Sequence, residues 1–198
     1  MIDHLTISQR VKIGKKRETL IIEALQQKGY DIQAAGIRED MVSKIDARLT
    51  LNGECGNVQI KTRDDDSGAD ILLCIFEPFG KKDHPQNVPG RDYISPYAWC
   101  ISHIRNTTRI IRGKTQKHVV DNVLREWDWD PNTTIFDSKV YCLPDGSHVQ
   151  LRVHRDRGAG GAHRMKLLCF IPPAIYDAYD VIATEQIVLS DLTLEAQG

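Results

Sequence analysis

The sequence predicts a mixed α/β fold in which a central sheet is flanked by helices. Three observations predict it. Residues 14–29 have the apolar periodicity of a helix, strand-like segments follow around an Asn-Gly pair at position 52, and residues 71–76 form an uninterrupted apolar run. Helical and extended patterns therefore alternate in the first part of the chain, as in α/β proteins.

The first expected helix covers residues 14–29. Apolar residues from Leu20 to Leu25 recur on one face at helical spacing, and Gly29 supplies a carboxyl-terminal stop. Three extended segments are expected next, at 30–36, 44–51 and 57–62. The Asn52-Gly53 pair is typical of a tight turn and joins the last two of them into a hairpin. The apolar run at 71–76 is typical of a central strand covered on both faces.

The second half of the chain gives weaker signals, because glycine and proline interrupt it. Its expected elements are a loop at 79–92, a helix at 117–127, strands at 139–143 and 148–154 that pair as a hairpin, and a strand at 165–171. With 198 residues the chain is long enough for one sizeable core and short for two independent domains. We therefore expect a single domain over residues 1–198.

The composition is that of a soluble globular protein, with 41% hydrophobic and 27% charged residues. No segment reaches the length needed to cross a membrane, and the amino terminus lacks the apolar region of a signal peptide, so we expect a cytoplasmic protein without a membrane partner. The five cysteines are scattered and lack the spacing of zinc ligands. We expect them to be free thiols.

Positive charge is concentrated in two segments of the second half, although the net charge is only −1. The basic residues that we expect to contact nucleic acid are Arg105, Arg109, Arg112 and Lys114 in the first segment, and Arg155, Arg157 and Arg164 in the second. Lysine and arginine contacts to phosphates supply much of the affinity of nucleic-acid-binding proteins. A solvated charged surface is the alternative explanation.

Asp46, Gln59 and Lys61 form the pattern that points to chemistry. Side chains two apart on a strand share a face, so Gln59 and Lys61 are expected to point the same way, and an antiparallel partner strand is expected to bring Asp46 beside them. An acid, an amide and an amine together suit metal-assisted hydrolysis of a phosphodiester. We expect Asp46, the Gln59 amide and the Ile60 backbone carbonyl to bind Mg²⁺, and Lys61 to contact water and phosphate.

These residues stand within a longer series: Gly14-x-x-x-Glu18, Leu25, Gly29-Tyr30, Ile45-Asp46 and Gln59-Ile60-Lys61-Thr62-Arg63. The series resembles the core motifs of the PD-(D/E)xK nuclease superfamily, and it is most similar to the archaeal Holliday-junction resolvases and the intron-encoded homing endonucleases. The resemblance covers about residues 10–77. It implies a restriction-endonuclease-like core there, followed at 93–198 by a carboxyl-terminal extension that carries the basic segments.

The resemblance also implies the activity and the partners. Glu18 would reach the metal site from the first helix, beside Asp46, Gln59 and Lys61, with Mg²⁺ or Mn²⁺ as the cofactor. The expected reaction is hydrolysis of duplex or branched DNA by a restriction, homing or junction-resolving enzyme, and cleavage of both strands favours a homodimer. Gln59 departs from the acid of most members, which removes a charge from the site. Asp70 and Glu77 are the carboxylates that we consider as compensation.

Other functions stay open at this stage. The same residues would serve an RNA-cutting or toxin nuclease. The neutral Gln59 also leaves room for a non-catalytic nucleic-acid-binding subunit that retains the fold. In a purely structural interpretation, Gln59 and Lys61 lie on a solvated strand face beside an ion pair with Asp46, and Glu18 forms an ordinary surface pair on its helix.

Overall fold

The computed structural model describes residues 7–36, 45–63, 71–79, 86–89, 97–126, 139–142, 148–157, 163–177 and 181–189. The chain divides into two compact units, and each is built from segments that are distant in sequence. The first unit comprises Met1–Gly68, Tyr97–Ile110 and Ile182–Gly198, and the second comprises Ala69–Pro96 and Ile111–Val181. The expected division into a core and a carboxyl-terminal extension does not follow these boundaries.

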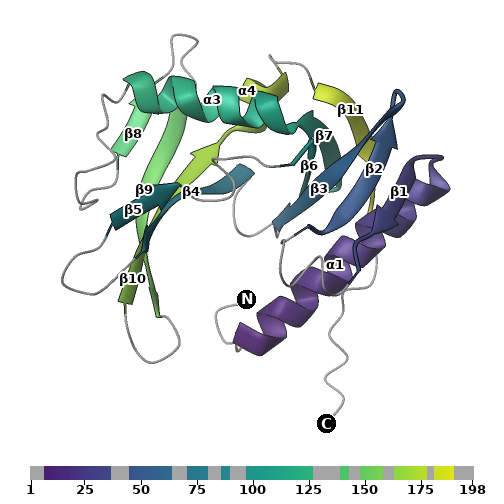
Figure 1. The fold of residues 1–198 in the computed structure, drawn as a ribbon, viewed down its shortest axis with the longest axis horizontal. Helices are drawn as coiled ribbons and strands as arrows, with labels where there is room; N and C mark the ends of the chain where they lie inside the picture. Colours follow the sequence, from purple (N-terminus) through teal and green to yellow (C-terminus); the bar gives the residue numbers. More distant parts are fainter. Residues whose placement is uncertain are drawn as a thin grey trace. The chain divides into compact units, whose positions relative to one another are not determined.

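A six-stranded mixed sheet carries the motif residues, so the predicted mixed α/β class is confirmed (Figure 1). Its strand order is β1-β2-β3-β6-β7-β11. The strands are Asp31–Ala34, Ala47–Leu51, Glu54–Arg63, Trp99–Ile104, Thr107–Arg112 and Val181–Gln186 in that order. Strand β2 pairs antiparallel with β1 and with β3, whereas β3 pairs parallel with β6.

Helix α1, Ile7–Gln27, confirms the first predicted helix and begins earlier than predicted. It ends where Gly29 adopts a φ of 90°, a conformation that glycine accepts without steric cost. The Tyr30 N–H donates to the Leu25 carbonyl at 3.1 Å, which closes the last turn. The chain then enters β1 directly, and helix and strand stay in contact.

The core of this unit lies between α1 and the sheet. Its buried members are Ile21, Ile22, Leu25, Ile32, Ala47, Leu49, Val58, Ile60, Trp99, Ile101, Ile110 and Ile187. Val58 and Ile60 belong to this core, as predicted. Because alternate side chains of a strand point to opposite faces, Gln59 and Lys61 are directed to the face of β3 away from α1.

The hairpin of β2 and β3 forms at the predicted turn, where Asn52 and Gly53 have φ values of 54° and 80°. Gly56 follows on β3 at a point of close approach. A Cβ atom there would lie 2.2 Å from the Cβ of Ala98, so no larger residue fits without a shift of the backbone. This position keeps β3 tightly packed against the segment that leads into β6.

Strands β6 and β7 were not predicted. They form a hairpin whose two connecting residues, Arg105 and Asn106, have φ values of 48° and 63°. All of β6 is buried. Inside the hairpin, His103 Nδ1 and Thr108 Oγ1 lie 2.8 Å apart in a buried hydrogen bond. Two-residue hairpin turns usually contain glycine at such angles, and this turn contains none.

A five-stranded sheet, of order β5-β4-β10-β9-β8, belongs to the second unit. Its strands are Gln86–Pro89, Ile71–Phe79, His163–Ile171, His148–Arg157 and Lys139–Cys142 in that order. The assignment of β4 to the core at 10–77 was therefore wrong, since β4 pairs with β10 and β5. The parallel neighbour of β3 is β6, which supplies the buried apolar strand in its place.

The loop expected at 79–92 contains the short edge strand β5, because Val88 pairs in the ladder with Glu77 despite the neighbouring proline. The hairpin of β8 and β9 is confirmed, as is a strand near 165–171. Helix α3, Gly113–Glu126, replaces the helix expected at 117–127, and a short helix α4, Pro173–Asp177, follows β10. Within the described part of the chain, no helix is long and apolar enough to cross a membrane.

Candidate active site

Asp46 lies immediately before β2, where the backbone leaves regular strand geometry. Its N–H donates to the Val58 carbonyl of β3 at 3.0 Å, while its carbonyl accepts from the Ala35 N–H, on the β1 side, at 3.1 Å. In a regular strand both groups of a residue point to the same side. The ladder also pairs Val58 with Ala47, so two successive residues face one residue of β3. This arrangement is a β-bulge, and bulges redirect side chains.

The Asp46 carboxylate is fixed on the middle residue of the Gln59-Ile60-Lys61 element. Its Oδ2 accepts the Ile60 N–H at 2.8 Å, and the side chain is only 13% exposed. The hydrogen-bonding groups of a strand lie in the plane of the sheet, so the carboxylate sits at the level of the strands. The Ile60 carbonyl points to the same side as its N–H, and it is therefore directed toward the start of β2.

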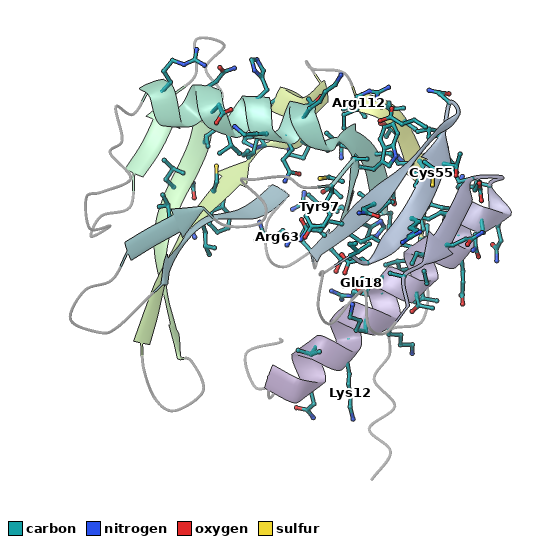
Figure 2. All side chains as sticks on the ribbon, viewed as in Figure 1. Lys12, Glu18, Cys55, Arg63, Tyr97 and Arg112 are labelled. Carbon is teal, nitrogen blue, oxygen red and sulfur yellow. The ribbon has the colours of Figure 1, made fainter. Side chains whose placement is uncertain are left out.

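Glu18 reaches the same region from α1. Lys15 Nζ lies 2.7 Å from Glu18 Oε2 and 3.7 Å from Asp46 Oδ1, so two carboxylates converge on one ammonium group. Figure 2 shows Glu18 on α1 beside the end of the sheet where β3 reaches Arg63. Lys15 and Glu18 are three residues apart, which is the usual spacing of an ion pair on the surface of a helix. The contact of Lys15 with Asp46, in contrast, connects the helix with the start of β2.

Gln59 and Lys61 flank Ile60 along β3. Gln59 lies beside Cys100 and Lys61 beside Ser102 on the parallel strand β6, and both side chains are directed to the face away from α1. Gln59 is only 9% exposed, whereas Lys61 is half-buried. Asp46 and Glu18 are thus brought together on the α1 side of the sheet, with the Asp46 carboxylate at the level of the strands. Gln59 and Lys61 are the backbone neighbours of Ile60, but their side chains are directed to the other face of β3.

The donor set fits a hard divalent cation, since every candidate donor is an oxygen. No three His, Cys, Asp or Glu side chains within the described ranges form a metal-binding group. Mg²⁺ is commonly bound through one or two carboxylates together with waters and substrate phosphates. The two carboxylates of Asp46 and Glu18 already gather a cation, the ammonium of Lys15. The Ile60 carbonyl and the Gln59 amide are the further oxygens nearest in sequence.

The first basic segment is spread over several elements. Arg105 is exposed on the turn between β6 and β7, and Lys114 is exposed in the first turn of α3. Arg109 and Arg112 are half-buried on β7 and three residues apart, so they point to opposite faces of the strand. The positions alone therefore do not make one continuous patch.

For several other residues predicted from the sequence, the structure describes the backbone alone or does not describe the residue. Arg155 and Arg157 lie on β9 and Arg164 lies on β10, but their side chains are outside the described set. Asp70 lies outside the described residues altogether. Glu77 lies on β4 and so belongs to the five-stranded sheet, with its side chain likewise outside the described set.

Lys15 is the residue that the sequence analysis missed. Its separation of three residues from Glu18 on a helix was a readable signal for an ion pair. Its approach to Asp46, 31 positions further along the chain, depends on how α1 packs on β2 and β3, and no local pattern reports that packing.

A second ionic cluster lies just beyond the carboxyl end of α1. Tyr30 Oη donates to Glu185 Oε1 at 2.6 Å, and Lys28 Nζ lies 3.0 Å from Glu185 Oε2. Burial, followed by the bond to the Glu185 carboxylate, raises the pKa of Tyr30 to about 12. The hydrogen bonds from Tyr30 and then Lys28 lower the pKa of Glu185. This cluster ties β11 to the segment between α1 and β1.

The chain matches no protein-family model and no curated protein. Among solved structures it is similar to the bacterial homing endonuclease I-Ssp6803I. The identity is 11% and the TM-score is 0.35, over 51% of this chain and 67% of that chain. The similarity is one of fold, and it assigns no role to any residue.

Proposed function

We propose that this chain is a PD-(D/E)xK-type endonuclease that hydrolyses DNA phosphodiester bonds with a divalent metal ion. The observation that carries the proposal is the 2.8 Å hydrogen bond from the Ile60 N–H to Asp46 Oδ2. It anchors an acid on the centre of the Gln59-Ile60-Lys61 element, while Lys15 links that acid to Glu18. A bulge that redirects Asp46 for this contact is typical of a functional position.

The residues that would hold the metal are Asp46, Glu18 and the Ile60 carbonyl, whereas the Gln59 amide, expected from the sequence to join them, is directed to the other face of β3. When bound, Mg²⁺ or Mn²⁺ supplies positive charge that polarises the scissile phosphate and stabilises its transition state. Asp46 has one oxygen engaged by a backbone N–H, so its orientation is fixed before any ligand arrives. Such preorganisation lowers the cost of assembling a charged site.

Lys61 supplies the remaining charge. It is half-buried on β3, two residues from Gln59, so its ammonium is held by a rigid strand and not by a loop. Its long stem would carry the ammonium from that face to the scissile phosphate, where it would bind a phosphate oxygen, orient the attacking water and offset the negative charge that develops on the phosphoryl group. Gln59 is neutral, which leaves Asp46 and Glu18 as the anionic ligands.

The basic segments would bind the DNA backbone. Arg105 and Lys114 are exposed, and charge-assisted contacts from such residues to phosphate position a duplex without reading its sequence. A homodimer in the cytoplasm, with one site per DNA strand, accounts for double-strand cleavage. Restriction, homing and junction-resolving roles are distinguished by the substrate that is cut most efficiently.

The test is a cleavage assay on supercoiled plasmid, linear duplexes, four-way junctions and matched RNA, each with Mg²⁺ or with chelator. The wild type is expected to cut DNA only with metal, and Asp46→Ala and Lys61→Ala are expected to lose the activity. Asp31→Ala removes an exposed acid of β1 in the same sheet and is the matched control, expected to cut normally. Undiminished cleavage by the first two variants would refute the assigned residues.

The rival function is a non-catalytic nucleic-acid-binding subunit. The observation that favours it is Gln59, which is neutral and only 9% exposed where most relatives of the proposed type carry an acid. This function predicts that the protein binds DNA but does not cut it with metal, and that Lys61→Ala leaves DNA binding unchanged. The same assay, combined with a binding measurement in chelator, separates the two functions.

A further inference from the structure

Lys15 lies where a cation is needed. Its ammonium is 2.7 Å from Glu18 Oε2 and 3.7 Å from Asp46 Oδ1, and these carboxylates come from different elements, α1 and the start of β2. Two carboxylates and one ammonium sum to one negative charge. The ammonium therefore screens the mutual repulsion of two acids without neutralising them both.

The three side chains differ in how firmly they are held. Asp46 is 13% exposed and bound to the Ile60 backbone, and Glu18 is 21% exposed, whereas Lys15 is 46% exposed. The carboxylates thus keep their positions more readily than the lysine. The long lysine stem allows its ammonium to leave the carboxylates for solvent without any movement of the helix.

We propose that Lys15 is a built-in counter-cation, which occupies the cation position between Glu18 and Asp46 in the metal-free protein and competes there with the divalent metal. This inference rests on the proposed function of the site as a metal centre. Binding of metal displaces the Lys15 ammonium into solvent, and no covalent bond changes. Lys15 thereby sets the metal concentration at which the site fills, and it keeps the two carboxylates together until then.

The competition can be measured without any cleavage assay. Mn²⁺ or Mg²⁺ binding is followed by electron paramagnetic resonance of free Mn²⁺ or by calorimetry, in the wild type and in Lys15→Met, which keeps most of the stem and removes the charge. Removal of one competing charge about 4 Å away is expected to tighten metal binding by about tenfold at moderate salt. Lys15→Arg, which retains the charge, is expected to bind metal much as the wild type does.

Lys12→Met is the matched control. Lys12 is exposed on the same helix, nearer its amino end than Glu18 (Figure 2), so its replacement changes the net charge equally. Its effect on metal binding is expected to stay below about twofold, because Lys12 is exposed and salt screens the interactions of exposed charges. A difference between the two methionine variants therefore isolates the position of Lys15 from the overall charge.

Thermal melting gives a second readout. In chelator, Lys15→Met is expected to melt below the wild type, because the two carboxylates then repel each other unscreened. On addition of Mg²⁺ the same variant is expected to gain more stability than the wild type, since ligand binding to the folded state stabilises it in proportion to affinity. The difference in melting temperature between the wild type and Lys15→Met is therefore expected to become smaller, or to change sign, when Mg²⁺ replaces the chelator.

The outcomes separate this inference from the function beneath it. Metal binding that Asp46→Ala abolishes, with Lys15→Met binding no tighter than the wild type, would overturn the role of Lys15 and leave the metal site standing. Absence of Asp46-dependent binding in both the wild type and Lys15→Met would overturn the metal site itself. Tighter Asp46-dependent binding in Lys15→Met alone supports both.

Discussion

Helix α1 carries one ionic cluster at its middle and a second just beyond its carboxyl end, and the two contain similar residues in opposite proportions. At the middle of the helix, one lysine, Lys15, contacts two carboxylates, Glu18 and Asp46. At the carboxyl end, one carboxylate, Glu185, receives both Lys28 and the hydroxyl of Tyr30. Among these named groups, the first cluster has two carboxylates to one ammonium, whereas the second has one carboxylate to one ammonium.

This difference teaches how to separate a structural ion cluster from a candidate site in the same fold. A balanced cluster satisfies its groups and ties chain segments together, and it needs no further ligand. A cluster with excess acid on firmly held groups is stabilised by an added cation, which is the requirement of a metal centre. The following predictions test whether the two clusters differ in this way.

The largest expected effect separates the clusters by activity. Asp46→Ala is expected to lower DNA cleavage by at least about a hundredfold, since removal of one group that stabilises transition-state charge has effects of that order. Glu185→Gln is expected to leave cleavage within about twofold at a temperature where both proteins are folded. Cleavage is measured as the initial rate with Mg²⁺. An equal decrease in the rate for Asp46→Ala and Glu185→Gln would contradict the proposal that only the Asp46 cluster takes part in catalysis.

Stability in chelator is expected to show the reverse order. Glu185→Gln removes the carboxylate that Lys28 and Tyr30 share and is expected to lower the free energy of unfolding by about 1 kcal/mol. Glu18→Gln leaves Asp46 as a partner for Lys15, so its cost is expected to stay below about 0.5 kcal/mol. Urea unfolding with the metal removed measures the change in the free energy of unfolding for both variants. A larger decrease for Glu18→Gln than for Glu185→Gln would contradict the proposed difference between the two clusters.

Alkaline pH is expected to weaken the cluster at Glu185 through Tyr30. The pKa of Tyr30 is raised to about 12 from an ordinary 10.0, so between these values the folded state binds more protons than the unfolded state. Stability therefore falls as the pH rises through this window. Tyr30→Phe is expected to flatten the part of the pH dependence of unfolding that this tyrosine contributes between pH 10 and pH 12. An unchanged slope would mean that the Tyr30 contact with Glu185 is not formed in solution.

The smallest effect concerns DNA binding, away from both clusters. Arg105→Ala removes an exposed positive charge from the turn between β6 and β7. It is expected to weaken binding a few-fold without regard to sequence, and to reduce the salt dependence of the affinity by about one unit of slope. Titrations at several salt concentrations measure this, and a slope equal to that of the wild type would exclude Arg105 from phosphate contact.

Local signals made part of this structure predictable from sequence. Helix α1 and the turn at Asn52-Gly53 were predicted correctly because periodicity and turn chemistry are properties of adjacent residues. The turn at Arg105 and Asn106 was missed, because neither residue is a glycine and both adopt positive φ. The strands on either side of that turn were consequently missed as well.

Non-local features were beyond sequence reasoning for a physical reason. The apolar run of β4 reads as a strand wherever it lies, and only pairing with β10 decides which sheet it joins. At the candidate site, Asp46 and the Gln59-Ile60-Lys61 element were singled out from spacing and family resemblance. The bulge at Asp46 and the approach of Lys15 depend on tertiary contacts, which the sequence does not display.

The most direct test of the metal centre is a crystal structure of the protein with Mn²⁺, analysed by anomalous diffraction. We predict a single strong anomalous peak about 2.0–2.4 Å from Asp46 Oδ1, close to Glu18 and the Ile60 carbonyl, with the Lys15 ammonium withdrawn from both carboxylates. A peak at another acidic site such as Glu185, or no peak in crystals that hold millimolar Mn²⁺, would contradict the account.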